Sequence, residues 1–376
     1  MRNVDAAGLG IGDDHPPRVM GVLNVSEESP YDPSVYDDPG EAAAYVDEEL
    51  VGEGADIVDI GLESANKKFD VLTAEQELER LETAVQTIES VSGDAVFSIE
   101  TRYHEVAEQA LKRGFDMVND ICGFADPEMP RVCEEYDVAV GKMASPADLE
   151  RPGAIEDVDE IYDALFRNGL TEKTIVDPAF GGWSEEKTLA DDRETFHRLR
   201  EFRAVGQPML VSINRKNFLR SLAGRPTEEA LPVSLAATAM AVERGAHVVR
   251  THDVKETVDA ALVGDAFTRE RVRETGAGVE ELDVTSVGEA ERHVAAVDGD
   301  ADPARAVARS FSLALPAEAR ERLREVVGTT EGAVVTGAGG RVVLAGTVAA
   351  LRGLSEAVDE PPALAAALDR VREGCG

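Results

Sequence analysis

The sequence predicts an α/β fold: a (β/α)8 TIM barrel followed by a small C-terminal α/β appendage. Two observations support this prediction. Short, β-rich apolar runs alternate eight times with longer helical patterns, and polar, reactive side chains follow almost every run. Barrels of this class build their active sites at the C-terminal ends of the strands. An open, doubly wound sheet stays as the alternative, because the sequence alone does not show closure.

The expected strands are spread over the first two-thirds of the chain, at residues 18–23, 56–60, 95–99, 115–118, 138–140, 174–176, 208–211 and 247–249. Amphipathic segments separate them, for example at 73–88, where Thr73 and Gln76 form a capping-box pattern. A second example is 227–244, where Ala and Val share one stripe. The last helix of the barrel is expected at 254–267.

The length of the chain requires more than a barrel. A barrel takes about 250 residues, and this chain has 376. We expect four segments: an N-terminal extension at 1–17, the barrel at 18–270, a linker region at 271–305 and a small C-terminal α/β domain at 306–376.

The expected C-terminal domain has its own pattern of elements. A strand is predicted at 310–315, a helix at 316–327 and a hairpin at 332–346, followed by Ala-rich helical sequence. The segment carries no cluster of nucleophile, base or metal ligands. A role in packing or oligomerisation is therefore favoured over a second active site.

The composition is strongly acidic. A formal net charge of −36 and a pI near 4.5 argue against binding to nucleic acid or to an anionic membrane, because most of the surface would repel phosphate groups. Hydrophobic residues make up 43% of the chain and recur periodically, which argues against disorder. A salt-adapted, halophile-like cytosol is the setting that we expect.

Cysteine usage and hydropathy predict the compartment. Cys122, Cys133 and Cys375 have no metal-ligand spacing and indicate reduced intracellular thiols. No apolar run approaches the about 20 residues that span a bilayer. We therefore expect a soluble, cytoplasmic protein that binds neither a membrane nor nucleic acid.

Acids, amides and cations stand at the exits of the expected strands: Asn24, Asp59, Glu100, Asn119, Lys142, Asp177, Lys216, Arg250 and His252. Taken singly, each has an ordinary explanation, because a polar residue just after a strand is usually a turn former or a helix cap. Asp120 and Asp253 fit the role of a cap, and Asp59 is compatible with a structural place in the barrel.

The combination is more informative than any single residue. Glu100 and Asp177, with the amide of Asn119, suit a flat heterocycle rich in N–H donors, because ionised carboxylates only accept hydrogen bonds and an amide does both. A basic corner suited to a phosphate group or a phosphate-bound metal ion comes from Asn24, Lys216, Arg250 and His252. A ligand with a polar ring at one end and phosphate at the other fits both sets.

Over about residues 18–267 the chain resembles the dihydropteroate synthases and the wider pterin-binding barrel superfamily. The matching segments are MGVLNV from Met20, GADIVDIGLES from Gly54, FSIET from Phe97, EVAEQALKRGFDMVNDICG from Glu105, VDPAFG from Val176, SINRKNFL from Ser212 and GAHVVRTHDV from Gly245. The resemblance implies a transferase of folate biosynthesis. In that family the amine of 4-aminobenzoate displaces pyrophosphate from 6-hydroxymethyl-7,8-dihydropterin diphosphate, giving dihydropteroate.

The resemblance also implies roles for particular residues. It assigns the pterin to Glu100, Asn119, Asp177 and Lys216, and the diphosphate to Asn24, Arg250 and His252. It implies Mg2+ as the cofactor with Asn24 as a ligand, and a catalytic set of Lys216, Arg250 and His252. The loop after the second strand, with Ser64, Asn66 and Lys67, is expected near the arylamine. A homodimer is implied as well.

The chain departs from the family pattern at several positions. The loops at 26–33 and 62–68 differ from the usual sequences, Glu100 stands where an Asp is usual, and Lys142 replaces a His. Three other functions therefore stay open. They are a non-catalytic or regulatory pterin-binding paralogue, a pterin-dependent methyltransferase of the same superfamily, and an aldolase that uses Lys216 as a Schiff base.

Overall fold

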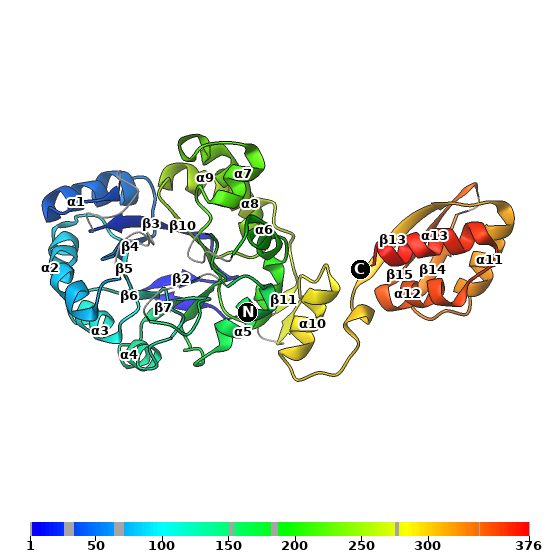
Figure 1. Cartoon of the computed structure of the whole chain (residues 1–376), viewed down its shortest axis with the longest axis horizontal. Helices are drawn as coiled ribbons and strands as arrows, with labels where there is room; N and C mark the ends of the chain where they lie inside the picture. Colours follow the sequence, from blue (N-terminus) through cyan, green and yellow to red (C-terminus); the bar gives the residue numbers. More distant parts are fainter. Residues whose placement is uncertain are drawn as a thin grey trace. The chain divides into compact units, whose positions relative to one another are not determined.

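The computed structural model describes residues 2–25, 34–63, 71–149, 153, 155–181, 187–274, 278–337 and 339–375. The chain forms two compact units, Met1–Glu270 and Arg271–Gly376 (Figure 1). Among the helices in these ranges, none is long and apolar enough to cross a membrane.

The first unit is a barrel of eight parallel strands. Its strands are β3(Arg18–Asn24), β4(Ile57–Gly61), β5(Val96–Thr101), β6(Met117–Asp120), β7(Ala139–Met143), β8(Thr174–Asp177), β9(Leu210–Val211) and β10(Val248–Thr251). They lie in the order β8-β7-β6-β5-β4-β3-β10-β9. A parallel bridge between Val176 and Met209 joins the two end strands, so the sheet curves into a barrel and the open alternative is wrong.

All eight strands predicted from the sequence are present. Seven of them end one to three residues later than predicted, because the ladder continues through polar residues such as Asn24, Asp120 and Asp177. The prediction stopped where the apolar run stopped. The polar residues at the strand exits are thus largely strand residues, and the alternation of the strand decides where each side chain points.

Helices follow the strands: α1(Pro39–Tyr45), α2(Ala74–Ser90), α3(His104–Lys112), α4(Met129–Glu135), α5(Val158–Phe166), α6(Leu189–His197), α7(Asn217–Ala223), α8(Leu231–Glu243) and α9(Val254–Ala266). A π-helix at Val46–Val51 continues α1. The predicted capping box of α2 is present, with Thr73 Oγ1 accepting from Gln76 N and Gln76 Oε1 accepting from Thr73 N. The helix predicted at 227–244 is a 3-10 turn at Thr227–Glu229 followed by α8.

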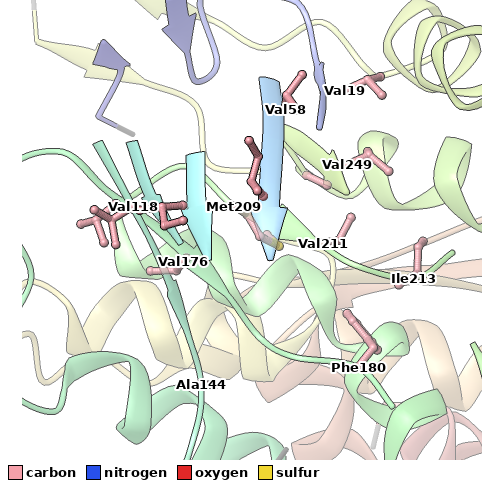
Figure 2. Close-up of a cluster of buried hydrophobic side chains, with 14 of the residues drawn as sticks. Val19, Val58, Val118, Ala144, Val176, Phe180, Met209, Val211, Ile213 and Val249 are labelled. Atoms are coloured by element: carbon pink, nitrogen blue, oxygen red, sulfur yellow. The ribbon is translucent and has the colours of Figure 1, made fainter. Parts of the chain in front are cut away.

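Alternate residues of each strand point outward and pack against the helices; we call this the outward parity, and the residues between them have the inward parity. Val58, Val118, Val176 and Val249 belong to this large apolar cluster, part of which is drawn in Figure 2. The other parity faces the interior of the barrel. Its first layer, at or near the start of each strand, is wholly apolar: Met20, Ile57, Val96, Met117, Ala139, Ile175, Leu210 and Val248.

The N-terminal extension covers this apolar layer. Its strands β1(Val4–Ala6) and β2(Leu9–Ile11) form an antiparallel hairpin. Val4, Ala6 and Ile11 pack in the same cluster as the first interior layer. The hairpin therefore closes the N-terminal end of the barrel with apolar contacts, and chemistry is left to the opposite end.

The second unit contains a small α/β domain. Its elements are β13(Ala308–Ala314), α11(Ala317–Val327), β14(Ala333–Thr336), β15(Arg341–Thr347), α12(Val348–Ala357) and α13(Pro362–Glu373). The sheet is antiparallel in the order β13-β15-β14. β13, α11 and the β14–β15 hairpin correspond to the strand, helix and hairpin predicted from the sequence.

The segment at 271–305, expected as a linker, has secondary structure of its own. It contains the short strands β11(Arg273–Glu274) and β12(Val279–Glu280), the helix α10(Val287–Ala295) and a 3-10 turn at Pro303–Arg305. Ala290 of α10 and Ala304 of the turn belong to the apolar cluster of the second unit.

Candidate functional site

Asp59 is the centre of a polar network inside the barrel. It lies on β4 two residues after Ile57, so it has the inward parity, and it is completely buried. Its Oδ2 accepts hydrogen bonds from Arg250 Nε at 2.8 Å and from Asn119 Nδ2 at 2.9 Å. Its Oδ1 is buried and has no hydrogen-bond partner among the described residues. The sequence places Asp59 among the strand-exit residues and is also compatible with a structural role, and the structure makes it the residue that joins two predicted site residues.

Glu100 extends this network across β5. Arg250 Nη2 donates to Glu100 Oε2 at 2.6 Å, so one guanidinium lies between two buried carboxylates. Burial raises the pKa of Glu100 to about 7, with help from the charge of Asp59 and against the opposing charge of Arg250. Burial opposes the charge of Arg250, but Glu100 and Asp59 together raise its pKa above the ordinary value. Arg250 therefore stays a cation.

Asp177 and Lys216 form a second pair of charges. Burial raises the pKa of Asp177 to about 6, although Ala179 N donates to its Oδ1 at 2.8 Å and Lys216 lies nearby. Burial also lowers the pKa of Lys216, while the charge of Asp177 acts in the opposite sense. Both side chains thus lie in an environment with little access to water.

Gly181 makes room for the Lys216 side chain. Its φ is +88°, which favours glycine, and a Cβ at this position would lie 2.9 Å from Lys216 Cδ. A larger residue at 181 would displace the lysine. Gly181 therefore allows the close approach of Lys216 to the chain after β8.

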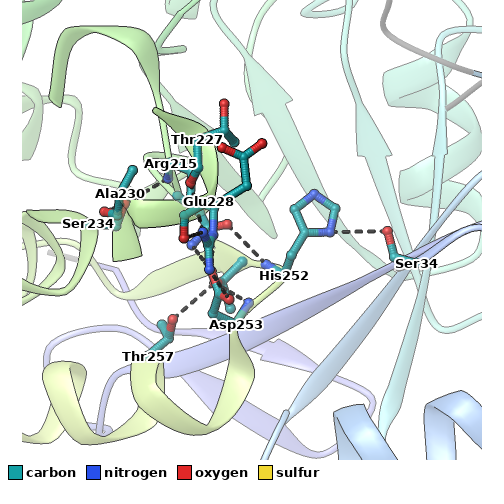
Figure 3. A network of polar contacts seen from close by, with 11 residues as sticks. Ser34, Arg215, Thr227, Glu228, Ala230, Ser234, His252, Asp253 and Thr257 are labelled. Carbon is teal, nitrogen blue, oxygen red and sulfur yellow. Dashed lines mark hydrogen bonds and ion pairs between the residues drawn. The ribbon is translucent and has the colours of Figure 1, made fainter. Parts of the chain in front are cut away.

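Asn24 and His252 meet through a residue that the sequence analysis did not select. Asn24 Nδ2 donates to Ser34 Oγ at 3.0 Å. Ser34 Oγ in turn lies 3.2 Å from His252 Nδ1 (Figure 3). Burial lowers the pKa of His252 to about 3, and the charge of Arg250 adds to this effect. The imidazole is therefore neutral near pH 7. Two residues assigned to the diphosphate are joined by one hydroxyl.

An ion pair fixes the exits of β9 and β10 to each other. Arg215 Nε and Nη2 donate to the two carboxylate oxygens of Asp253, each at 2.8 Å (Figure 3). Arg215 Nη1 also donates to Thr227 O at 2.8 Å. Asp253 occupies the N-cap position of α9, but its side chain makes no cap hydrogen bond, so the cap interpretation is wrong. Lys216 and His252 are the sequence neighbours of this pair.

Lys142 does not belong with the other strand-exit residues. It has the outward parity of β7, and its Nζ donates to Gly169 O at 2.8 Å and to Arg167 O at 2.5 Å. The same Nζ lies 4.5 Å from the centroid of the Phe124 ring. The prediction that Lys142 converges on the site is therefore wrong, because Gly141 and Met143, not Lys142, share the inward parity. Asp120 is also outward and accepts from Cys122 N and Phe124 N, as a turn former does.

The predicted arylamine residues Ser64, Asn66 and Lys67 lie outside the described residues. The chain on both sides of them is anchored, since Glu63 Oε1 accepts from Leu72 N at 2.9 Å. Glu63 also forms an ion pair with Arg102, whose side chain is 1% exposed. Arg102 lies just after β5, two residues beyond Glu100, and the sequence also places it among the polar residues at the strand exits.

The predicted residues that the structure describes thus form three groups at the C-terminal end of the barrel. Asp59 joins Asn119 to Arg250, and Arg250 contacts Glu100; Ser34 joins Asn24 and His252; Asp177 and Lys216 form the third group. The first group offers carboxylates and an amide to N–H donors, and the second offers neutral polar groups beside the Arg250 cation. This arrangement suits a ligand that is a polar ring at one end and an anion at the other.

A profile of the pterin binding enzyme family matches residues 20–252, and the chain belongs to this family. Within it, the relatives include several dihydropteroate synthases. The dihydropteroate synthase of Bacillus subtilis is 30% identical over 255 residues, which cover 66% of this chain and 88% of the relative. That of Escherichia coli is 30% identical over 273 residues, which cover 69% and 95%.

A longer halophilic relative matches as well. The probable bifunctional folylpolyglutamate synthase/dihydropteroate synthase of Halobacterium salinarum is 36% identical over 260 residues, covering 66% of this chain and 31% of the relative. The corresponding protein of Haloferax volcanii is covered over 32% of its length. The chain thus matches about a third of these two relatives.

Solved structures agree with the sequence comparison. A dihydropteroate synthase from Coxiella burnetii in complex with pteroic acid has a TM-score of 0.60 and 28% identity, covering 70% of this chain and 98% of that one. The dihydropteroate synthase from Thermus thermophilus in complex with 4-aminobenzoate has a TM-score of 0.57 and 28% identity, covering 71% and 100%. The barrel prediction is confirmed.

Proposed function

We propose that the barrel unit is a dihydropteroate synthase of folate biosynthesis. It condenses 6-hydroxymethyl-7,8-dihydropterin diphosphate with 4-aminobenzoate and releases pyrophosphate. The C–O bond between the pterin methylene and the diphosphate breaks, a C–N bond to the arylamine forms, and the amine loses a proton. The observation that carries this proposal is the buried network in which Asp59 joins Asn119 to Arg250, and Arg250 to Glu100.

The pterin end of the site is supported by the acceptors in this network. Glu100, Asp177 and Asn119 present carboxylate and amide groups from three strands, and Asp59 Oδ1 adds a buried acceptor without a partner among the described residues. An unpaired buried oxygen is costly, so an N–H donor on a ligand would satisfy it. Lys216 lies beside Asp177 and shapes the charge around the ring.

The diphosphate end is supported by Arg250, His252 and Asn24. A cationic guanidinium stabilises the negative charge that develops on the leaving diphosphate. Asn24 is the single protein oxygen ligand that we assign to Mg2+, and this fits an ion that keeps most of its contacts with phosphates and water. The ion would supply further positive charge to the leaving group. No covalent protein nucleophile is required, which separates this proposal from a Schiff-base aldolase.

We assign the arylamine to the loop that carries Ser64, Asn66 and Lys67. The support is the anchoring of its two ends, where Glu63 contacts Leu72 and Arg102. A related arylamine with another anionic group fits the same description.

A homodimer through α8 and α9 is the assembly that we propose. The helix α8 carries one charged residue, Glu243, in a chain with 30% charged residues. Its outer face includes the exposed Met240, and the adjoining α9 exposes Leu262 and is followed by Phe267, which is 81% exposed. A helix that is apolar all round is normally covered. Sedimentation of the protein and of Met240→Glu tests this: we expect a dimer that the variant weakens, and a monomeric wild type would contradict it.

We place the protein in a salt-rich cytoplasm. The support is the excess of 74 acidic over 38 basic residues and the three free cysteines. Screening by salt reduces the repulsion among so many carboxylates. We therefore expect activity and thermal stability to rise with KCl concentration, and a stability that falls with added KCl would contradict this placement.

Pyrophosphate release tests the proposed function. The purified chain is incubated in molar KCl with Mg2+ and the pterin diphosphate, with and without 4-aminobenzoate, and pyrophosphate and dihydropteroate are measured together. Release that requires the arylamine and matches dihydropteroate formation supports the synthase. Tight pterin diphosphate binding without turnover would instead support the non-catalytic pterin-binding paralogue.

A further inference from the structure

Ser34 connects the two loops that carry the diphosphate end of the site. It lies ten residues after Asn24 and 218 residues before His252, and it is completely buried. Its Oγ accepts a hydrogen bond from Asn24 Nδ2 at 3.0 Å and lies 3.2 Å from His252 Nδ1. A single hydroxyl thus bridges the exit of β3 to the exit of β10.

The contact with Ser34 orients the Asn24 amide. An asparagine side chain has one donor group and one acceptor group, so fixing Nδ2 fixes the direction of Oδ1. Asn24 Oδ1 faces Gly61, since a Cβ built on Gly61 would lie 3.1 Å from it and 3.6 Å from Glu100 Oε1. The oxygen is therefore directed toward the inside of the barrel end, beside Glu100. A side chain on residue 61 would fill this place.

The same hydroxyl orients the His252 ring. Ser34 Oγ lies within hydrogen-bond distance of His252 Nδ1, and this contact limits the rotation of the ring. The His252 backbone is held separately, with His252 N donating to Asn214 Oδ1 at 3.5 Å. Arg250, two residues earlier on β10, contributes the cation at this end. The orientation of the ring relative to Asn24 thus depends on Ser34.

We propose that Ser34 is a positioning residue for the diphosphate group and its Mg2+. Its hydroxyl holds the Asn24 amide and the His252 ring in one arrangement, so that these two side chains address the same anionic group. This inference rests on the proposed function, because it takes the diphosphate end as given. It concerns only that end, since Glu100, Asn119 and Asp177 are positioned by other contacts.

The proposal is tested by comparing ligand binding at the diphosphate end of the site with ligand binding at the pterin end. Equilibrium binding is measured by calorimetry with two probes, inorganic pyrophosphate in the presence of Mg2+ and 6-hydroxymethylpterin alone. The proteins are the wild type, Ser34→Ala and the matched control Ser145→Ala. Ser145 is 1% exposed and its Oγ accepts from Gly153 N at 3.1 Å, so the control also removes one buried hydroxyl from the barrel unit.

We expect Ser34→Ala to weaken pyrophosphate binding about tenfold, which corresponds to one hydrogen bond to a polar partner, and to change pterin binding less than about twofold. Ser145→Ala is expected to change neither. Equal losses with both probes, or no loss of pyrophosphate affinity in Ser34→Ala, would overturn the role of Ser34. A wild type that binds neither probe would overturn the proposed function and this inference with it.

Discussion

The barrel unit and the C-terminal α/β domain treat charge in opposite ways. The barrel buries Asp59, Arg102, Asp177 and other charged side chains in its interior. Between residues 306 and 375, by contrast, the buried side chains that the structure describes are aliphatic, apart from the Cys375 thiol. Burying a charge is costly unless it is paired, so a fold that needs only stability avoids it. The difference assigns the chemistry to the barrel and a packing role to the C-terminal domain.

Arg250→Met is expected to have the largest effect. The substitution removes the cation between Asp59 and Glu100 and leaves both carboxylates buried without it. We expect a loss of at least about a thousandfold in dihydropteroate formation and a fall of about 3–5 kcal/mol in the free energy of unfolding. Initial rates and urea denaturation measure the two effects.

Arg341→Met is the matched control in the C-terminal domain. Arg341 is exposed, so the free energy of unfolding is expected to change by less than about 0.5 kcal/mol, with no change in rate. An Arg250→Met enzyme with a normal rate would break the comparison between the two regions.

Leu344→Ala tests the packing role of the C-terminal domain. Leu344 is completely buried in its core, and its truncation is expected to cost this domain about 2–5 kcal/mol. Calorimetry is expected to show an earlier transition for this domain while the rate of the barrel at lower temperature is unchanged. If the rate fell while the C-terminal domain was still folded, that domain would have a part in the reaction.

Asp59→Asn tests how much the Asp59 carboxylate contributes to pterin binding. The amide keeps the shape of Asp59 but removes the charge that holds Arg250 and Asn119. A hydrogen bond to a charged group contributes about 1.5–3 kcal/mol, so pterin affinity is expected to fall about tenfold to a hundredfold. Calorimetric titration with 6-hydroxymethylpterin measures it. An unchanged affinity would return Asp59 to a purely structural role.

The smallest expected effect concerns pH. Burial raises the pKa of Asp177 to about 6 and that of Glu100 to about 7, above the values of an unfolded chain. Between about pH 4 and about pH 7 the unfolded chain releases these protons first, so the contribution of these two carboxyl groups to the free energy of unfolding falls as pH rises and levels off above this window. Burial lowers the pKa of His252 to about 3, so this group contributes in the opposite sense, and Asp177→Asn isolates the carboxyl contribution.

Pterin binding is expected to change in the opposite direction. It strengthens several-fold over the upper part of the window, because ionised carboxylates accept N–H bonds. Titrations at several pH values measure this, and Asp177→Asn is the control that should flatten part of the profile. An affinity that weakened with rising pH would contradict the assignment of these carboxylates.

The sequence predicted the fold more completely than the site. Hydrophobic periodicity located all eight strands, because burial against the helices selects apolar residues locally. Periodicity could not show which polar residues at the strand ends point into the barrel and which point outward. Lys142 is therefore grouped with Lys216 by the sequence, although its side chain points toward the helices. The motif shared with the pterin-binding family supplied the assignments that periodicity could not.

Other site residues escaped prediction because their contacts are distant in sequence. Ser34 meets His252 across 218 residues, and Asp59 meets Arg250 across 191. No local pattern encodes either pair. Asp253 shows the same limit, since its neighbours in sequence predicted a cap while the carboxylate pairs with Arg215 from another loop.

Lys216, a residue of the candidate site, and Lys142, which lies outside the site, together give the most direct test of where the site lies. Binding of 6-hydroxymethyl-7,8-dihydropterin diphosphate is measured for the wild type, Lys216→Met and Lys142→Met, after melting curves have shown that each protein is folded. We predict that Lys216→Met weakens binding at least about tenfold. Lys142→Met is expected to bind as the wild type does, because the Lys142 ammonium group contacts carbonyl oxygens and the Phe124 ring outside the barrel interior. Loss of binding in Lys142→Met with retention in Lys216→Met would contradict the placement of the site at the inward-facing ends of the strands.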